Sequence, residues 1–238
     1  MDPAADLDAV ALVLLRVSQL LVDFPEIVDL DINPLLADES SVIALDARIN
    51  VVARQEPASK RLAIRPYPKE LEELIPVGDG REVLLRPIVP EDEPSLQTAF
   101  TKLTAEEVRL RFFAPKKTLS HFAAVRFTQI DYRREMALVA IVEQASGPIQ
   151  VGVARYFINP DKSGCEFAIV VSDRIQHQGI GTRLMKALME AARDHGLTRI
   201  EGTVLRENAS MLMLMKELGF AQSRSTEDPE LVVVERWL

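Results

Sequence analysis

The sequence predicts an α/β (α+β) protein, in which a central sheet with flanking helices follows a small acidic N-terminal piece. An apolar strand, Glu166–Val171, leads through a turn containing Gly179 and Gly181 directly into an amphipathic helix. Several predicted strands follow one another before this turn. The excess of negative over positive charge is confined to residues 1–56. These observations predict one mixed domain over residues 81–238, behind a separate piece of different composition.

Charge and composition limit the classes of partner. The chain has 238 residues and a net charge of −8, with 47% hydrophobic and 27% charged residues, as expected of a packed soluble protein. Residues 1–56 carry 11 acidic and three basic side chains, whereas residues 57–238 carry 25 of each. Neither part has the basic footprint of a nucleic-acid-binding protein, so we expect no nucleic-acid partner.

Hydropathy and cysteine content predict a cytoplasmic protein without a membrane partner. No apolar run reaches the ~18 residues of a membrane span, because Arg16 interrupts the apolar segment Val10–Val22. No cationic region precedes that segment, so we expect no signal peptide. The single cysteine, Cys165, excludes an internal disulfide framework and a cysteine-rich metal site, and the three histidines are too widely separated to suggest metal ligands.

The N-terminal piece, residues 1–56, is predicted to form a helix and a hairpin. Asp8–Asp23 has a helical apolar face, and Val28–Leu36 and Val42–Ile49 are predicted strands joined by a short turn. The predicted strands carry three oxygen donors of the type that Mg²⁺ prefers: Asp31, Asn33 and Asp46.

Proline content predicts a linker over residues 57–80. Seven of the 14 prolines fall between Pro57 and Pro94, and residues 57–68 cannot form a regular helix. One helical turn is predicted at Leu71–Ile75, after which Arg81–Arg86 alternates like a strand and begins the second domain.

The second domain is predicted to have the order β-α-α-β-β-β-α-β-α-β. A helix begins near Pro90–Ser95, and a second has Thr104 and Glu107 in capping-box spacing. Gly219 suits the end of the last helix. The further predicted elements are helices at Thr104–Phe113, Leu119–Phe127 and Met211–Leu218, and strands at Met136–Glu143, Ile149–Asn159, Glu166–Val171, Leu197–Val204 and Leu231–Leu238.

The glycine-containing turn before the helix predicts an anion site. A strand-to-helix turn aims unpaired N–H groups and the positive end of the helix dipole at one point. Gly179 and Gly181 let the main chain approach a phosphate without a Cβ in the way. The Rossmann spacing fails because Leu184 stands at the third glycine position, and no Walker lysine follows. A helix start with incidental glycines is the alternative interpretation.

This turn resembles the pyrophosphate loop of GNAT-superfamily acyl-CoA N-acyltransferases. The resemblance rests on Gln176-x-x-Gly179-x-Gly181, on Asn208 after the next strand, and on the Leu-Gly-Phe that ends the last helix. It implies a GNAT fold with a mixed central sheet and acetyl-CoA as cosubstrate. The positions it implies for CoA binding are Ile169, Val170, Val171, Gln176, His177, Gln178, Gly179, Ile180, Gly181, Thr182 and Asn208.

Asn208 and His177 each have an alternative interpretation besides CoA binding. The resemblance implies that N–H groups from Gln178 to Thr182 hold the pyrophosphate and that Asn208 binds the pantetheine. An asparagine before a helix is equally well explained as an ordinary N-cap. His177 could be read as a base, but a solvent-facing loop side chain explains it better, because only the backbone is needed there.

The N-terminal piece resembles the end of the ATP-grasp region in NDP-forming acyl-CoA synthetases. The resemblance rests on Asp-Ile-Asn33-Pro-Leu followed by Ala-Leu-Asp46-Ala-Arg-Ile. It implies that Asn33 and Asp46 stand where that family holds the metal of ATP. The glycine loop and the lysine of an ATP site are absent from the sequence, so we favour a solvated acidic hairpin and expect no functional metal here.

The whole chain resembles bacterial Pat-type protein lysine acetyltransferases, in which a synthetase-like region precedes a GNAT domain. The resemblance rests on Leu62-Ala-Ile-Arg-Pro-Tyr-Pro68 and on Ile130–Ala137. It implies a lysine ε-amine of a protein as acceptor, for example on an acyl-CoA synthetase. Two other hypotheses stay open: an N-acetyltransferase for small amines or amino acids, and a regulatory module that binds acyl-CoA without turnover.

Glu166 is the predicted general base. A lysine ammonium, with a pKa of ~10.4, must lose a proton before its nitrogen attacks a thioester. Glu166 matches the strand-four glutamate of Pat-like enzymes, and a sensor would not need it. A cross-strand salt bridge with Arg155 is the alternative. The neighbouring Cys165 suggests a covalent acyl-enzyme, but it alternates to the opposite strand face and is predicted to be a buried structural thiol.

Overall fold

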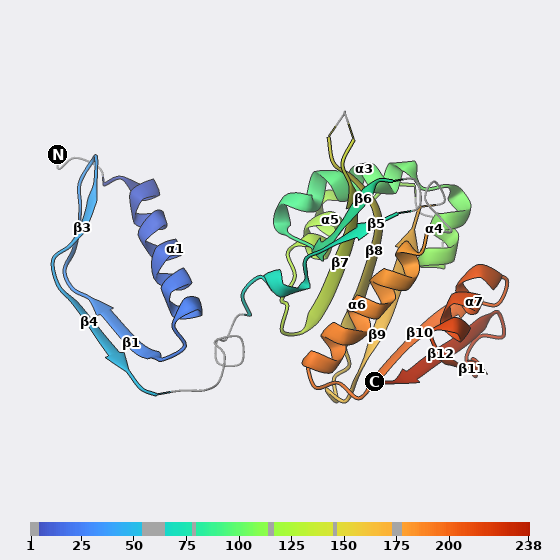
Figure 1. Ribbon diagram of the computed structural model, residues 1–238. Coiled ribbons are helices and arrows are strands. Elements are labelled where there is room, and N and C mark those ends of the chain that lie inside the picture. The colour runs from blue at the N-terminus through green and yellow to red at the C-terminus, as the bar shows by residue number, and fades with distance from the viewer. Residues whose placement is uncertain (1–4, 54–64, 78–79, 114–116, 145–146, 173–177) are drawn as a thin grey trace. The chain divides into compact units, whose positions relative to one another are not determined.

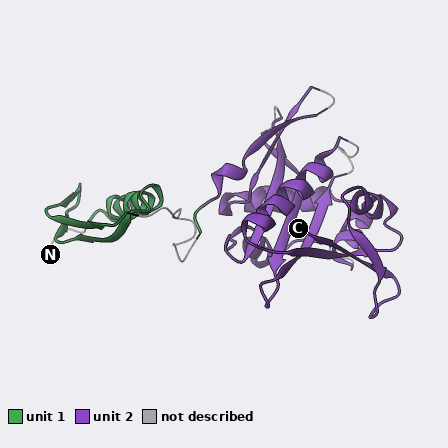
Figure 2. Ribbon diagram, turned by 60° about the horizontal axis from the view of Figure 1, so that its bottom comes forward, with its two compact units in different colours: residues 1–66 green, residues 67–238 purple. Residues whose placement is uncertain are grey.

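The computed structural model of the protein describes residues 5–53, 65–77, 80–113, 117–144, 147–172 and 178–238 (Figure 1). The chain divides into two compact units, Met1–Pro66 and Tyr67–Leu238 (Figure 2). Residues 57–64 and 78–79 of the predicted linker lie outside the described residues. The second unit contains the predicted strand–turn–helix and most of the buried side chains.

The first unit is a helix followed by an interrupted hairpin. Asp6 caps the helix by accepting a hydrogen bond from the Ala9 N–H at 3.0 Å. The first of its four strands pairs with the fourth, and the second pairs with the third. The cis Asn33–Pro34 peptide lies between the first and second strands. Proline has no N–H to donate, so the predicted strand breaks there. The elements are α1 (Leu7–Asp23), β1 (Ile27–Ile32), β2 (Leu35–Ala37), β3 (Val42–Ala44) and β4 (Ala47–Val51).

The second unit is built around one mixed, eight-stranded sheet. The strand order is β11-β12-β10-β9-β8-β7-β6-β5, with β9 and β10 parallel and the other neighbours antiparallel. The strands are β5 (Glu73–Pro76), β6 (Glu82–Pro87), β7 (Glu135–Val142), β8 (Ile149–Ile158), β9 (Gly164–Val171), β10 (Arg199–Leu205), β11 (Ala221–Arg224) and β12 (Leu231–Trp237). The helices are η1 (Lys69–Leu71), η2 (Pro90–Asp92), α3 (Glu93–Lys102), α4 (Ala105–Phe112), α5 (His121–Thr128), α6 (Ile180–Asp194) and α7 (Ala209–Glu217).

The sequence interpretation placed the end of the linker incorrectly. Residues 67–80 were assigned to it, with a helical turn at Leu71–Ile75, but the turn lies earlier and β5 forms the edge strand of the sheet beside β6. Ile75 and Val77 are buried, so the burial of apolar side chains favours the strand over an extended linker. Strand β11 was not predicted, since all four of its residues are exposed and its sequence has no alternating pattern.

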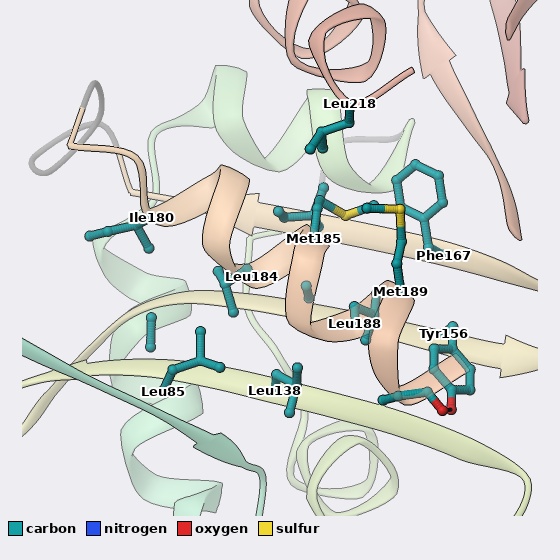
Figure 3. Close-up of a cluster of buried hydrophobic side chains, with 14 of the residues drawn as sticks. Leu85, Leu138, Tyr156, Phe167, Ile180, Leu184, Met185, Leu188, Met189 and Leu218 are labelled. Carbon is teal, nitrogen blue, oxygen red and sulfur yellow. Dashed lines mark hydrogen bonds between the residues drawn. The ribbon is translucent and has the colours of Figure 1, made fainter. Parts of the chain in front are cut away.

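The main core lies between α6 and one face of the sheet (Figure 3). Leu184, Met185 and Leu188 of α6 are fully buried against alternate residues of β7 and β8, such as Leu138 and Tyr156. The intervening strand residues form a second apolar cluster on the other face, where α3 contacts β8. Helix α6 is therefore fixed in place, and its N-terminus is set beside the end of β9.

Among the described residues, no helix combines the length and the apolar character that crossing a membrane requires.

Candidate active site

Strands β9 and β10 begin as neighbours and then separate. Their parallel pairing covers three positions, ending where Glu201 lies opposite Glu166. Beyond that point β9 continues to pair with β8 on its other side. We call Gly164–Glu166 the paired segment of β9 and Phe167–Val171 its open segment. In the described part of the chain, the edge of the open segment that faces β10 has no strand partner.

A phenylalanine ring fills the space where the two strands begin to separate. A Cβ built on Gly202 of β10 would lie 2.6 Å from the Phe167 ring, closer than real Cβ contacts. The same ring packs edge-on against Phe220, with 5.5 Å between the ring centroids. Gly202 therefore provides the room that the Phe167 ring occupies at this point.

Two adjoining cavities follow the open segment. The first, of ≈ 250 Å³, lies between β9 and β10, and the second, of ≈ 570 Å³, extends to the start of α6. Ile169, Val171, Ser210 and Met211 line both, so we treat the two cavities as one cleft. The predicted positions that line it are Ile169, Val170, Val171, Gly179, Ile180, Gly181, Thr182 and Asn208.

The N-terminus of α6 forms one end of the cleft. Gly179 is its N-cap, with φ of 79°, and makes no side-chain capping bond. The N–H groups of the first turn, Ile180–Thr182, have no partner within the helix. Gly181 packs closely, since a Cβ there would lie 3.4 Å from a Leu214 side-chain carbon. The first turn has no acidic residue, so its positive dipole end is suited to an anion.

Three other predicted positions belong to the turn before α6. Gln176 and His177 lie outside the described residues, so their predicted roles remain predictions. Gln178 is half-buried beside Gly179, and its Oε1 atom has no hydrogen-bond partner among the described residues.

Four carboxylates line the cleft, those of Glu106, Glu107, Glu166 and Glu217, and the first two are already engaged. Glu107 completes the capping box of α4, with Oε2 accepting from the Thr104 N–H at 2.6 Å. Glu106 forms an ion pair with Arg109 at 2.9 Å, and hydrogen bonds from that guanidinium lower the pKa of Glu106. Glu166 is exposed, and the ion pairs and caps of the described residues do not include it. Its carboxylate is therefore available for another task.

The alternative role of Glu166, a salt bridge with Arg155, does not match the observed register. Arg155 lies opposite Ala168, whereas Phe157 lies opposite Glu166. Arg155 instead donates a hydrogen bond from Nη2 to the Phe127 carbonyl oxygen at 3.0 Å. Another cation is electrostatically coupled to Glu166: burial lowers the pKa of Arg111 to about 10, and the Glu166 charge opposes this shift.

Asn208 is the N-cap of α7. Its Oδ1 accepts hydrogen bonds from the Met211 N–H and from the Ser210 hydroxyl, each at 3.1 Å. The capping interpretation thus describes Asn208 correctly, and the residue also lines the cleft. The two roles are compatible because capping uses the side-chain oxygen and leaves the amide N–H₂ as a donor.

Cys165 is a buried structural thiol. It is fully buried in the main core, on the face of β9 opposite to Glu166, and its sulfur lies 3.8 Å from the Arg199 carbonyl oxygen. Burial raises the pKa of the Cys165 thiol to about 12, and the nearby Glu201 charge adds to this shift. A neutral, inaccessible thiol cannot act as a nucleophile at neutral pH.

The residues at the metal positions implied for the first unit are neighbours in the hairpin. The Asn33 N–H donates to the Asp46 carbonyl oxygen at 3.1 Å, so the two residues are backbone neighbours. The Asp46 carboxylate, however, lies 3.7 Å from Nε of Arg48, and Asp31 is opposite Arg48 in the ladder. No group of histidine, cysteine or carboxylate side chains that could hold a metal ion occurs among the described residues.

Several residues of the cleft were not predicted from the sequence. Arg111, Thr203, Ser210 and Met211 line it together with Glu106 and Glu107. Ser210 follows Asn208 within one helical turn, so the predicted turn was a signal for it. Arg111 is on an apparently solvated, charged helix, and only the packing of α4 against β9 places it here.

Comparison with known proteins identifies the family. A model described as the acetyltransferase (GNAT) family matches residues 104–220. An acetyltransferase of Pseudomonas aeruginosa is 30% identical over 157 residues, which is 66% of this chain and 84% of that protein. The GNAT domain of S. lividans PAT superposes with a TM-score of 0.66 at 28% identity, covering 72% of this chain and 99% of the other. The chain belongs to the GNAT acetyltransferase family and is an acyltransferase.

Two further relatives and one domain model are similar to parts of this chain. Acetyltransferase Pat of Mycolicibacterium smegmatis is 29% identical over 75% of this chain, which spans 51% of that protein. An ATP-grasp domain model matches residues 1–51. ADP-forming acetate–CoA ligase I of Archaeoglobus fulgidus is 47% identical over 48 residues, 20% of this chain and 7% of that enzyme. The first unit is therefore similar to a fragment of a synthetase ATP-grasp region.

A solved structure with the same fold holds coenzyme A. RimL, a ribosomal-protein N-acetyltransferase in complex with coenzyme A, superposes with a TM-score of 0.55 at 17% identity over 70% of this chain and 98% of its own. At this level of identity the likeness concerns the fold alone.

Proposed function

We propose that the protein transfers an acetyl group from acetyl-CoA to lysine ε-amines of proteins, with Glu166 as general base. The observation that carries the proposal is the cleft along the open segment of β9. It begins at a carboxylate, Glu166, that forms no ion pair or cap among the described residues, and it ends at a helix N-terminus without a side-chain cap.

The cleft suits the parts of acetyl-CoA in order. The N–H groups of Gly179 to Thr182 would hold the pyrophosphate, and the Thr182 hydroxyl would add a donor. The pantetheine carries two amides, which would pair with the unpartnered edge of Ile169–Val171 as an added strand does. Asn208 would donate its side-chain N–H to the pantetheine from the opposite side. The thioester would then lie near Val170, on the Glu166 side of the cleft.

The chemistry follows from this placement. Glu166 accepts a proton from the lysine ammonium, and the neutral nitrogen attacks the thioester carbonyl carbon. An N–H group of the open segment polarises that carbonyl and stabilises the oxyanion that forms. The nitrogen then loses its second proton to water, the carbon–sulfur bond breaks, and the CoA thiolate takes a proton from water. The products are N-acetyl-lysine and CoA.

A protein acceptor agrees with the exposure of Glu166. An exposed base can be reached by a lysine that stays attached to a large partner. The relatives named Pat support the same class of acceptor, and an acyl-CoA synthetase is a reasonable first substrate to test because the first unit is similar to a synthetase fragment. We also propose a cytoplasmic location, since acetyl-CoA and such substrates are found there.

A direct test uses mass spectrometry. The full chain is incubated with acetyl-CoA and a panel of acyl-CoA synthetases, and in parallel with free amino acids and small amines. Acetylated lysine in a synthetase, absent in reactions with Glu166→Gln, is the expected result. Acetylation of the small amines alone would contradict the protein acceptor. Calorimetric binding of acetyl-CoA without any acceptor-dependent CoA release would point instead to a regulatory module.

A further inference from the structure

A second cavity lies on the same face of the sheet as Glu166. In the ladder between β8 and β9, Val153 is opposite Val170 and Arg155 is opposite Ala168, so these four side chains share one face. Glu166 precedes Ala168 by two residues and therefore lies on that face as well. Val153 and Arg155 line the cavity, which has a volume of ≈ 190 Å³ and is also lined by α3 and the end of α4.

The walls of this cavity are mainly apolar and buried. Leu96 and Phe100 of α3 are 8% and 6% exposed, and Val151 and Val153 of β8 are 8% and 9% exposed. An apolar cavity of ~150 Å³ holds a molecule of benzene, which has six carbons. The present cavity therefore has room for a hydrocarbon chain of similar size.

The arginines of α4 and β8 in the walls are engaged within the protein. Arg155 donates a hydrogen bond to the Phe127 carbonyl oxygen at 3.0 Å, and its guanidinium carbon lies 4.5 Å from the centroid of the Phe127 ring. The guanidinium of Arg111 lies 5.0 Å from the Phe112 ring centroid, and the Glu166 charge acts on it. An occupant of the cavity therefore does not have to carry a negative charge.

The cavity meets the cleft at the place proposed for the thioester. Val170 and Arg111 line both cavities, and Ser172, just after β9, lines only the second one. Along β9 the exposed base Glu166 comes first, the thioester lies near Val170, and the second cavity follows. An acceptor lysine that arrives on the Glu166 side thus leaves the second cavity free.

We propose that this cavity binds the hydrocarbon chain of acyl-CoA thioesters longer than acetyl-CoA, with about six carbons in the acyl group. The inference rests on the proposed function, because it uses the same placement of the thioester near Val170. The chain passes Val170 and contacts Leu96, Phe100 and Val153. The bonds that form and break are those of acetyl transfer, so hexanoyl-CoA and a lysine give N-hexanoyl-lysine and CoA.

The acceptor side chain is a less suitable occupant. A lysine ammonium in this cavity would lie among the cations Arg111 and Arg155, and like charges disfavour its entry. A lysine also continues into the backbone of its protein, whereas an acyl chain ends in a methyl group that a closed apolar end can hold.

Calorimetry with a series of thioesters tests the binding. The series is acetyl-CoA, butyryl-CoA, hexanoyl-CoA and decanoyl-CoA. Each methylene that enters an apolar site strengthens binding by about fourfold, so hexanoyl-CoA should bind at least ~10-fold more tightly than acetyl-CoA. Decanoyl-CoA should gain nothing further, because its chain exceeds the cavity.

The outcomes of this series separate the inference from the proposed function. Equal affinities for acetyl-CoA and hexanoyl-CoA would overturn the inference and leave the proposed function in place. A steady rise up to decanoyl-CoA would also overturn it, because adsorption to an open apolar surface has no length limit. If none of the thioesters binds, both the inference and the proposed function are wrong.

A filled cavity assigns the effect to this site. Ala99 is a half-buried residue of α3 that lines the cavity, and Ala99→Phe should reduce hexanoyl-CoA affinity to that of acetyl-CoA while acetyl-CoA affinity changes by less than about threefold. The matched control is Ala187→Phe, at a half-buried alanine of α6 that packs on the main core. It should keep the preference for hexanoyl-CoA, and an equal loss in both variants would refute the assignment. If Ala99→Phe lacks a cooperative melt, Leu103→Phe, at another half-buried residue of the lining, decides instead.

A transfer assay then tests the position of the chain during the reaction. An acyl-CoA synthetase is incubated with the full chain and an equal mixture of acetyl-CoA and hexanoyl-CoA, and modified lysines are read by mass spectrometry. Both modifications are expected, and Ala99→Phe should lower the ratio of hexanoyl to acetyl product by about 10-fold or more. Normal acetyl transfer with no hexanoyl transfer would overturn the placement of the chain beyond Val170. Chain-length-dependent binding that Ala99→Phe abolishes, with no transfer of either group, would keep the cavity assignment and refute the proposed function.

Discussion

The paired and the open segments of β9 differ in which strands hydrogen-bond to their backbone. In the paired segment, β8 and β10 take both edges, and Cys165 is fully buried in the core. In the open segment one edge faces a cleft instead of a strand, although the side chains of Phe167 and Ile169 remain buried. One segment of β9 is therefore hydrogen-bonded on both edges within the sheet. The other has backbone N–H and C=O groups on one edge that a ligand in the cleft could pair with. Substitutions in the two halves should separate stability from activity.

The largest effect is expected at Glu166, where the two segments meet. Glu166→Gln keeps the shape of the side chain but removes the basic oxygen. We expect kcat to fall by ~10²–10⁴-fold, while acetyl-CoA affinity and the thermal midpoint stay unchanged. The rate of the variant should recover partly at high pH, because more of the lysine acceptor, with a pKa of ~10.4, is already neutral there.

The matched control for Glu166 is Glu106→Gln. Glu106 lines the same cleft but is paired with Arg109, so its loss should change kcat by less than about threefold. Steady-state rates at several pH values measure both variants. Full turnover by Glu166→Gln at neutral pH would refute the assignment, and a water molecule held by strand carbonyl groups would become the leading candidate for the base.

A smaller effect is expected at the far end of the cleft, beside the N-terminus of α6. Gly179→Glu places a negative charge at the N-terminus of α6, and its Cβ meets no atom within 4 Å, so the fold has room for it. Acetyl-CoA affinity should fall by at least ~10-fold, or about 1.4 kcal/mol, measured by calorimetry. Gly179→Gln shares the backbone strain at φ of 79° but adds no charge. Equal affinities of the two variants would remove the charge argument.

In contrast, a change at the boundary between the two segments should affect stability. Gly202→Ala brings a Cβ against the Phe167 ring, and overpacking of this kind costs about 1–3 kcal/mol. For a domain of this size, each kcal/mol lowers the thermal midpoint by about 2–4 °C. Differential scanning calorimetry measures the shift. A midpoint equal to that of the unmodified chain would show that the ring moves aside freely.

The smallest catalytic effect is expected at Cys165 in the paired segment. Cys165→Ala should leave kcat unchanged and cost about 1 kcal/mol of stability. Because the folded-state pKa of the thiol is about 12, against an ordinary value of 9.0, the folded state keeps its proton longer than the unfolded state. Its contribution to stability is complete below about pH 9 and is lost as the pH rises towards 12. Denaturant unfolding of Cys165→Ala should show a flatter pH dependence in that range.

The sequence predicted the second unit well because its signals are local. The capping box at Thr104, the glycine at the start of α6 and the cap at Asn208 each specify backbone geometry within a few residues. The edge strand β5 was missed because its prolines suggested a linker, whereas pairing with β6 and the burial of Ile75 decide its structure. Propensity cannot detect a pairing that depends on a distant strand.

The site was only partly predictable for a related reason. The residues of β9 and of the turn before α6 are sequence neighbours, so a pattern could identify them. Arg111 and Arg155 come from a helix and a strand that meet only through packing, and their burial is a property of the folded unit. The capping box of Glu107 was predicted from its spacing to Thr104, whereas the place of Glu106 and Glu107 beside Glu166 in the cleft depends on the packing of α4 against β9.

The short parallel ladder between β9 and β10 also has a consequence for cooperative unfolding. Three paired positions and the α6 crossover join the strands β5–β9 to β10–β12, so these two halves of the sheet are natural subunits of local opening. A ligand in the cleft contacts β9 of one half and β10 of the other, so it binds the form in which both halves are folded together. At 100 times its dissociation constant it would stabilise the folded unit by about 2.7 kcal/mol, and amide hydrogens of β10 should gain more exchange protection than those of β6.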